Sequence, residues 1–543
     1  MKKTFKLLTL IAALALVTGC STTPGGNSGD NSTPGGGGGA GFSFNDEQLN
    51  TEQVIHTENQ KKYLNLDKIY YHITASDLSS CGANGNSDVS KPNKVTINWE
   101  YEPTTAAEVS KFQLYFGQKE DLSDAYVVNG TKENSISFYN AFLGDNYFKV
   151  VANLDDGSTE ESDVKVFKVD AQAPRNLYVG NMPNCRDMGG RVTYAGGKIK
   201  QGLIYRTAGN RFDNRSSIDD ECIDVLTNQL KVKTEINVAN GDSNNVNLPG
   251  VKLVNAYMDY GATPYSNLAR NAERVRQVMD TLADENNYPV FYHCRIGTDR
   301  TGITGMMIGG LLGIPFNEVF QDYCFSNFAP IDGQRYPNKP SDPNGDDPAK
   351  YIDEILAMPG KNYQEQTYNA LRSIGVPAAT LNKVIDIMTE GNKAELPEGK
   401  VGTGSDLTST ATVKTASDYK NPASYYALSS NGEANYTADF TAGEKDVVIY
   451  LGSTDSSDSK KLASCITLKI DDVEQTIVDK TLFKAGFGKT QQNNRTGYMF
   501  NLLGKYDFTA GSHKITVSVK SGTFNLGTIA VFDHVANTTD VVK

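Results

Sequence analysis

The stretch His293-Cys294-Arg295-Ile296-Gly297-Thr298-Asp299-Arg300-Thr301-Gly302 decides how the centre of this chain is interpreted. The residues before it, Pro289 to Tyr292, have the apolar character of a buried strand, and Thr301 to Leu312 predicts a buried helix with many small residues. The amides of a short loop between a strand and a helix converge above the helix N-terminus, where the helix dipole favours an anion. Cys294 would lie in that field, so we expect its thiol to ionise near neutral pH.

A guanidinium follows this thiol along the chain. Arg300 lies six residues after Cys294, in the first turn of the predicted helix. Its planar group can bind two oxygens of a phosphoryl group and of the transition state for its transfer. Gly297 permits close approach of the backbone within the loop. The stretch therefore predicts a phosphoryl site, with further substrate contacts from Arg295, Ile296, Gly297 and Thr298.

The same stretch resembles the H-C-x5-R-[ST]-G loop of the protein tyrosine and dual-specificity phosphatases. The resemblance implies that Cys294 attacks phosphorus to form a phosphocysteine, and that Arg300 binds the phosphoryl oxygens. It also implies that the hydroxyl of Thr301 helps the thiolate to leave, and that His293 orders the loop rather than acting as a general base. Such a reaction has two covalent steps and uses no metal and no cofactor.

Other central segments resemble one branch, the atypical bacterial tyrosine phosphatases related to secreted mycobacterial lipid and protein phosphatases. Asn184–Gly190, N-C-R-D-M-G-G, is similar to the N-F-R-D-x-G-G opening of that branch. Three further segments resemble a strand, a helix end and the closing helices of the branch: Gly202–Thr207, Asp322–Asn327 and Tyr363–Met388. The likeness covers most of residues 175–391 and implies an α/β domain. For Arg186 it leaves substrate binding and a buried, salt-bridged turn as alternatives.

The chain departs from that branch in two places. The branch often carries Ala-Gly-Lys-Asp inside the loop, where this chain has Ile296–Asp299. The lysine that would attract polyanionic lipid headgroups is therefore missing, which argues against phosphoinositide specificity. The second departure is Asn237–Ala239, N-V-A, where the branch commonly has D-L-R; the sequence assigns it no function.

The reaction needs a proton donor for the leaving oxygen, and two aspartates compete for that role. Asp259 lies 35 residues before Cys294, close to where related phosphatases place a general-acid loop. Asp299 lies inside the cysteine loop, and the matching aspartate of the branch is thought to take part in catalysis. We favour Asp259 as the acid, with Asp299 organising the loop or positioning water.

Residues 1–20 predict a lipoprotein signal peptide. A positively charged start precedes the apolar run Leu7–Leu16, which is too short to span a bilayer as a stable helix. Val17-Thr18-Gly19-Cys20 resembles the lipobox of bacterial lipoproteins. This resemblance implies acylation of Cys20 and a lipid anchor on the extracytoplasmic side of the cell membrane. Residues 21–42, rich in Gly, Ser, Thr and Pro, predict a flexible linker.

Composition limits the partners. The 543 residues carry a formal charge of −12, and this acidity argues against nucleic acid, because the phosphate backbone requires a basic surface. The 7 cysteines include no C-x-x-C pair, so neither a zinc site nor a disulfide framework is indicated. The sequence leaves open whether a single bridge forms among Cys81, Cys185, Cys222, Cys324 and Cys465.

The length predicts several domains, and the patterns on both sides of the central α/β domain (174–395) predict β-sandwiches. Residues 43–173 resemble a fibronectin type III or immunoglobulin-like sandwich with an N-terminal extension. Residues 400–543 resemble the jelly-roll carbohydrate-binding modules of secreted enzymes, and D-F-T-A-G occurs twice in them, at Asp439–Gly443 and Asp507–Gly511. These modules are expected to bind a glycan or a surface protein.

The sequence thus predicts an extracytoplasmic phosphatase for phosphotyrosine, in a protein or a small phosphoester, or for another phosphomonoester. Two alternatives stay open. One is an inositol-phosphate, phytate or phosphoinositide phosphatase, which the missing loop lysine argues against. The other is a surface glycan- or protein-binding lipoprotein with an inactive phosphatase-like domain, which the intact Cys294, Arg300 and Thr301 argue against.

Overall fold

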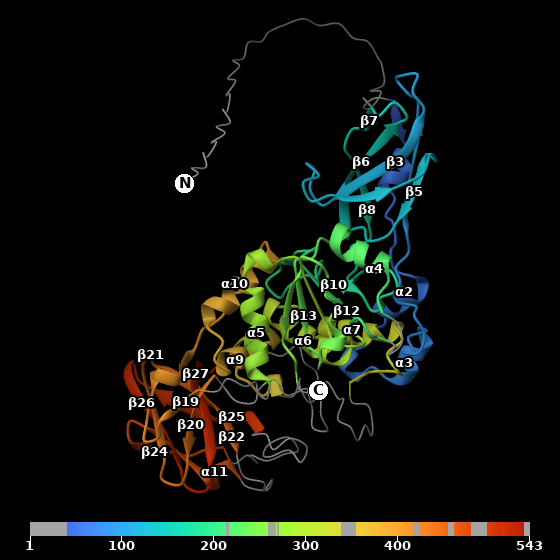
Figure 1. Cartoon of the computed structure of the whole chain (residues 1–543). Helices are drawn as coiled ribbons and strands as arrows, with labels where there is room; N and C mark the ends of the chain where they lie inside the picture. Colours follow the sequence, from blue (N-terminus) through green and yellow to red (C-terminus); the bar gives the residue numbers. More distant parts are fainter. Residues whose placement is uncertain are drawn as a thin grey trace, which may run out of the picture.

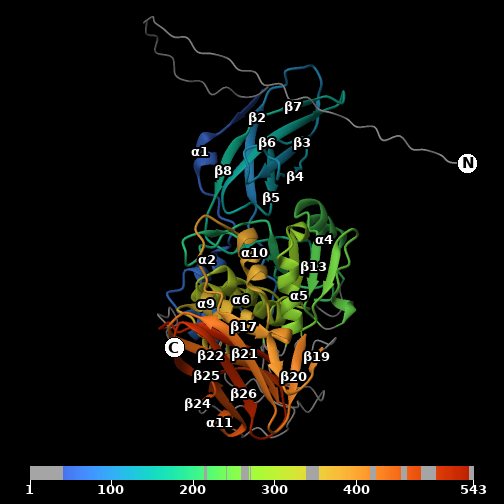
Figure 2. The same cartoon turned by 90° about the vertical axis from the view of Figure 1, so that its left-hand side faces the viewer.

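The computed structural model describes residues 41–212, 217–239, 241–258, 268, 271–337, 354–415, 423–453, 461–478 and 497–536. Three regions follow one another along the molecule: a β-region at the N-terminal end, a central α/β region and a second β-region (Figure 1, Figure 2). The chain is therefore a multidomain protein. The signal peptide, Cys20, Asp259 and most of the linker lie outside the described residues. Within those ranges no helix is long and apolar enough to cross a membrane.

The N-terminal β-region consists of two antiparallel sheets around an aromatic core. One sheet contains β1 (Phe42–Phe44), β2 (Val95–Tyr101) and β5 (Ser135–Phe138). The other contains β3 (Val109–Gly117), β4 (Tyr126–Asn129), β6 (Gly144–Leu154), β7 (Thr159–Glu161) and β8 (Lys165–Val169). Alternate residues of β2 are buried, because successive side chains of a strand point to opposite faces. Trp99 packs edge-on against Phe112, with ring centroids 5.1 Å apart.

The segment between β1 and β2 begins with α1 (Asp46–Asn50), which packs against β8 of this region. The rest of the segment packs on the central region and contains α2 (Glu58–Leu64), a 3-10 turn (Tyr70–His72) and α3 (Ala75–Ser80). We call residues 58–93 the N-terminal arm. Its Tyr63 and Tyr70 are buried in the core of the central region, and the Tyr63 hydroxyl donates to the carbonyl of Gln321 at 2.8 Å. Figure 1 shows α2 and α3 beside the central region, although the sequence patterns grouped this segment with the β-region.

The central region is built on a mixed sheet of six strands. The strand order is β14 (Lys252–Asn255), β13 (Thr234–Asn237), β15 (Val290–His293), β12 (Ile204–Thr207), β10 (Arg186–Asp187) and β9 (Arg175–Asn176). The strands from β14 to β12 are parallel, and β10 and β9 continue the sheet in antiparallel pairing. All residues of β13, β15 and β12 are buried, as in a parallel sheet with covered faces.

Helix α6 (Asp299–Leu312) runs through the middle of this region, and every one of its residues is buried. Its small residues make that possible, since a Cβ at Gly302 would lie 2.5 Å from the ring of Tyr323. The helices are α4 (Asp220–Asp224) with a π-helical turn (Val225–Gln229), α5 (Ala272–Leu282), α6 (Asp299–Leu312), α7 (Phe316–Phe325), α9 (Tyr363–Ser373) and α10 (Ala378–Met388). A short ladder pairs β11 (Lys198–Ile199) with β16 (Thr389–Glu390).

The C-terminal β-region also has two antiparallel sheets. The first contains β17 (Lys400–Thr403), β19 (Val413–Thr415), β20 (Ser424–Leu428), β22 (Gly443–Ser453), β25 (Gly497–Phe508) and β27 (Phe524–Asp533). The second contains β18 (Leu407–Ser409), β21 (Glu433–Phe440), β23 (Ile466–Ile470), β24 (Val473–Gln475) and β26 (Gly511–Val519), and α11 (Leu462–Cys465) precedes β23. Each D-F-T-A-G repeat carries the chain from one sheet to the other, and Phe440 and Phe508 of the two repeats pack 4.9 Å apart.

The C-terminal β-region shares a core with the central region. Helix α9 lies against β22 and β27, and the buried side chains of Tyr450 and Phe532 belong to the central hydrophobic cluster. The Thr528 hydroxyl donates to the carbonyl of Ser373 at the end of α9, at 2.6 Å. Because the contact is apolar and hydrogen-bonded, these two regions meet through a packed interface.

Candidate active site

Cys294 lies at the carboxyl edge of the parallel sheet. It directly follows β15, which pairs with β12 on one side and β13 on the other, and α6 begins five residues later at Asp299. The thiol-bearing residue is 2% exposed. The structure therefore has the strand, loop and helix order that the sequence predicts, with the loop at the edge where open α/β sheets bind ligands.

Gly297 gives the loop its tight bend. Its φ is +72°, and a Cβ on it would lie 2.6 Å from the carbonyl oxygen of Thr207 at the end of β12. A side chain at this position would therefore collide with the backbone of the neighbouring strand. The Gly297 carbonyl accepts a hydrogen bond from Arg206 Nη2 at 2.9 Å, so its oxygen is turned into the protein.

The side chain of Asn184 holds the loop from behind. Its Nδ2 lies 3.1 Å from the Ile296 carbonyl, 3.0 Å from the Gly297 carbonyl and 3.2 Å from the Thr298 hydroxyl. Its Oδ1 accepts a hydrogen bond from Arg186 Nη1 at 2.6 Å, which fixes the orientation of the amide. Asn184 thus pulls inward the carbonyl groups whose exposure would repel an anion.

Three arginines surround the buried carboxylate of Asp322 beneath the loop. Arg186 Nε and Arg191 Nη2 each donate to Asp322 Oδ1 at 2.9 Å, and Arg206 Nη1 donates to Oδ2. Burial alone would raise the pKa of Asp322, but the three guanidiniums together hold that pKa well below its usual range. Arg186 is 1% exposed and bound to Asp322, Asn184 and Ser326. These contacts are those of the salt-bridged turn that the sequence offered as one alternative for Arg186.

His293 connects the nucleophile to a buried carboxylate. Its Nδ1 lies 2.9 Å from the carbonyl oxygen of Cys294, and its Nε2 lies 2.9 Å from Glu235 Oε1 on β13. Glu235 also accepts hydrogen bonds from the amides of Val246 and Asn247, at 2.7 and 3.0 Å, which fix its carboxylate in place. Both ring nitrogens of His293 therefore have an oxygen partner, and the ring is held in one orientation behind Cys294. Sequence reasoning missed Glu235.

Asp299 forms an ion pair. Its Oδ1 accepts from Arg335 Nε at 3.2 Å, and both side chains are mostly buried. Arg335 was also not foreseen, because it comes from an irregular segment after α7. The side chain of Arg295 points away from the loop interior. Its guanidinium donates to the Phe212 carbonyl at 3.2 Å and to the Asp332 carboxylate at 2.9 Å.

Arg300 and Thr301 occupy the first turn of α6. Arg300 is 9% exposed, which places its guanidinium largely inside the protein, and its carbonyl accepts from the Thr304 hydroxyl. The Thr301 hydroxyl is buried and has no hydrogen-bond partner among the described residues. A buried hydroxyl in that state is able to donate to a sulfur or an anion in the loop.

One comparison with known proteins concerns the central region. The sequence model of the tyrosine phosphatase family matches residues 177–391. The match indicates a phosphatase-family domain over the central region, which contains all the residues of the cysteine loop. No curated protein matches the chain.

Solved structures align with about a quarter of the chain. They include an exo-β-1,3-galactanase from Phanerochaete chrysosporium (15% identity, TM-score 0.19, 25% of this chain and 29% of that one). They also include a family 35 carbohydrate binding module from Clostridium thermocellum (11% identity, TM-score 0.19, 25% and 97%). A third is a carbohydrate binding module of lichenase 5A from Cellvibrio mixtus (12% identity, TM-score 0.20, 25% and 98%). The chain thus spans less than a third of the galactanase.

Three of the other described cysteines have thiols with a raised pKa. All six cysteines in the described ranges are unpaired thiols. Burial raises the pKa of Cys222 to about 12, and it raises the pKa of Cys185 and Cys324 further. These thiols are therefore protonated and unreactive at neutral pH.

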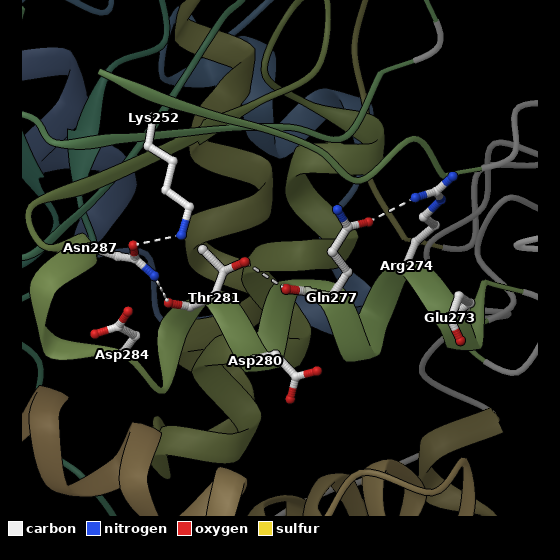
Figure 3. A pocket seen from close by; sticks show the side chains of 8 residues that line it. All are labelled: Lys252, Glu273, Arg274, Gln277, Asp280, Thr281, Asp284 and Asn287. Atoms are coloured by element: carbon white, nitrogen blue, oxygen red, sulfur yellow. Dashed lines mark hydrogen bonds between the residues drawn. The ribbon is translucent and has the colours of Figure 1, made fainter. Parts of the chain in front are cut away.

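A polar hollow of about 500 Å³ lies elsewhere, along α5 (Figure 3). Its lining side chains are Lys252, Glu273, Arg274, Gln277, Asp280, Thr281, Asp284 and Asn287. Lys252 Nζ donates to Asn287 Oδ1 at 3.0 Å, and Arg274 donates to Gln277 at 2.8 Å. The hollow contains none of the predicted site residues and so is separate from the cysteine loop.

Proposed function

We propose that this chain is a cysteine-dependent phosphatase that hydrolyses phosphotyrosine or another phosphomonoester. The observation that carries the proposal is the position of Cys294 between the end of β15 and the start of α6, with Arg300 in the first helical turn. A helix N-terminus and a guanidinium both favour an anion at this point. The match of residues 177–391 to the tyrosine phosphatase family supports the assignment.

The reaction proceeds in two steps at phosphorus. The Cys294 thiolate attacks, the bond between phosphorus and the leaving oxygen breaks, and the oxygen takes a proton from an acid. Water then attacks the phosphocysteine, the sulfur–phosphorus bond breaks, and phosphate leaves while the thiolate is restored. Arg300 binds the phosphoryl oxygens in both steps, and the Thr301 hydroxyl stabilises the departing sulfur.

We assign the proton donor to Asp259 and a positioning role to Asp299. The Asp299 carboxylate is paired with the Arg335 guanidinium, which holds it at the start of α6. It is suited to orienting the attacking water or to fixing the start of α6.

We place the enzyme outside the cytoplasm, anchored through an acylated Cys20, with the linker separating the folded regions from the membrane. This part of the proposal rests on the sequence of residues 1–42. The substrates it implies are phosphorylated proteins or small phosphoesters on the outer side of the membrane. The β-regions would keep the enzyme close to a glycan or a surface protein.

Substitution of the nucleophile tests the proposal. Cys294→Ser should lower kcat on p-nitrophenyl phosphate by at least about 10³-fold, because serine at this position is not ionised at neutral pH. The variant should still bind tungstate, since the loop amides and Arg300 are retained. The matched control, Cys465→Ser in the C-terminal β-region, should keep wild-type activity. An active Cys294→Ser variant would disprove the covalent mechanism.

A substrate panel then separates the phosphatase classes. Phosphotyrosine peptides, inositol hexakisphosphate and a phosphoinositide in vesicles are compared by phosphate release with the wild-type protein. We expect the highest kcat/KM for phosphotyrosine, because the loop residue Thr298 supplies no positive charge for polyanionic headgroups.

A further inference from the structure

The N-terminal arm reaches the back of the cysteine loop. Ser90, near the end of the arm, is 8% exposed, and its hydroxyl accepts a hydrogen bond from the amide of Asn184 at 3.3 Å. Asn184 is the residue whose side chain binds Ile296, Gly297 and Thr298 of the loop. One residue therefore separates the arm from the loop.

Asp88 fixes the direction of this contact. Its Oδ1 accepts from the Ser90 hydroxyl at 2.7 Å and from the Ser90 amide at 3.3 Å. Because the Ser90 hydroxyl donates its hydrogen to Asp88, a lone pair of the Ser90 oxygen is free to accept from the Asn184 amide. The three residues form a directed chain from a carboxylate on the arm to the amide that holds the loop.

Asn184 needs this support because of its backbone. Its φ is +62°, in the left-handed region that is sparsely occupied by residues other than glycine. The Ser90 contact holds the amide of a residue in that conformation, while Arg186 holds the side-chain oxygen. One contact fixes the backbone of Asn184 and the other fixes its side-chain amide, whose Nδ2 faces the loop.

The arm is itself anchored at this position. The Val89 amide donates to the carbonyl of Phe328 at 2.8 Å, and the buried Gln60 side chain donates to the Val89 carbonyl at 3.0 Å. The Gly85 amide donates to Asn327 at 2.8 Å, and Asn327 in turn binds the backbone of Arg335, the partner of Asp299. The arm thus supports both Asn184 and the segment that carries Arg335.

We propose that Ser90 and Asp88 of the N-terminal arm are positioning residues of the phosphate-binding loop, acting through Asn184. The inference rests on the proposed phosphatase function and extends it to a part of the chain outside the region that matches the phosphatase family. In this arrangement the arm completes the catalytic region, and the loop reaches its anion-binding shape only while the arm is docked.

The test uses full-length protein and the variants Ser90→Ala, Asp88→Ala and the double variant. Loss of one buried hydrogen bond that positions a site should lower kcat/KM for p-nitrophenyl phosphate by roughly tenfold. The dissociation constant for tungstate, measured by calorimetry, should rise by a similar factor. Because Asp88 acts through Ser90, the double variant should lose no more than Ser90→Ala alone. Ser80→Ala is the matched control, since its hydroxyl donates to Asp77 within α3.

The outcomes separate this inference from the proposed function. If both single variants keep wild-type kcat/KM and tungstate affinity, or lose only thermal stability, the positioning role is wrong and the phosphatase assignment stands. If the wild-type protein fails to hydrolyse every phosphomonoester tried, the assignment is wrong. Tungstate affinity then decides the positioning role alone, with weaker binding by Ser90→Ala supporting it and unchanged binding overturning it.

Discussion

His293 shows how one buried side chain links the sheet to the nucleophile. Its ring bridges the Cys294 carbonyl and the Glu235 carboxylate, and Glu235 lies on the strand next to β15. The imidazole and the carboxylate are both buried, so each is a polar partner that the other requires inside the protein. The pair therefore fixes the end of β15, directly before the nucleophile.

We predict that Glu235→Gln loosens the support of His293. Glutamine still accepts a hydrogen bond but carries no charge, so its bonds to the His293 ring and to the amides of Val246 and Asn247 are weaker than those of a carboxylate. The expected result is roughly tenfold lower kcat/KM for p-nitrophenyl phosphate, because the same ring contacts the carbonyl of Cys294. Steady-state kinetics measure this effect. Glu221→Gln, at an exposed carboxylate that accepts from the Tyr178 hydroxyl, is the control; equal kcat/KM for all three proteins would contradict the prediction.

Asp322 acts at the scale of the elements. Its carboxylate on α7 binds arginines from β10, from β12 and from the turn after β10. Arg206, the arginine from β12, also donates to the Gly297 carbonyl of the cysteine loop. A helix, two strands and the cysteine loop are therefore tied to one buried charge. Removing that charge leaves three guanidiniums inside the protein without compensation.

We predict that Asp322→Asn lowers the free energy of unfolding by about 3 to 5 kcal/mol, as for other broken buried ion pairs. The pKa of Asp322 is depressed in the folded state, so its stabilising effect is present above the pKa of the unfolded chain and is lost as pH falls. Wild-type stability should therefore decrease from about pH 4 downward, and the variant should lack this component. Urea unfolding at pH 7 and at pH 3 measures both. Equal stability of the two proteins at pH 7 would refute the prediction.

At the scale of the whole molecule, hydrophobic clusters cross the limits between the regions. The arm contributes Tyr63, Tyr70 and Leu78 to the central cluster, and the C-terminal β-region contributes Tyr450 and Phe532. The central region also contacts the N-terminal β-region through the buried ion pair of Arg175 and Asp187. Arg175 of this pair donates to the carbonyls of Asn140 and Ala141 in the N-terminal β-region. Domain limits read from sequence therefore cut through packed contacts.

We predict that a fragment of residues 174–395 is much less stable than residues 41–543. Each buried tyrosine, phenylalanine or leucine side chain contributes about 1.5 to 3 kcal/mol, so losing several exceeds the margin of a typical domain. The fragment should unfold at lower temperature, without a cooperative transition, and should bind a hydrophobic dye. Circular dichroism melting and dye fluorescence check this. A fragment that melts cooperatively at the same temperature as residues 41–543 would show that the shared core is dispensable.

The sequence by itself determined the strand, loop and helix around Cys294 and the spacing that puts Arg300 in the first turn. These features are local, because apolar periodicity and the small residues of α6 act over a few positions. The matching family segments placed Asn184 and Asp322 in the same domain. They did not show that Arg186 faces Asp322 rather than a substrate.

Only the tertiary structure decided which polar groups meet. Glu235 lies 58 residues from His293, Arg335 lies 36 from Asp299, and Ser90 lies 94 from Asn184. Pairing over such distances depends on which strands adjoin and where the arm docks, and no local pattern encodes it. Buried polar groups must nevertheless find partners, since each one left without a hydrogen bond costs stability. The sequence alone therefore predicts the cysteine loop, and the tertiary structure is required to identify the residues that position it.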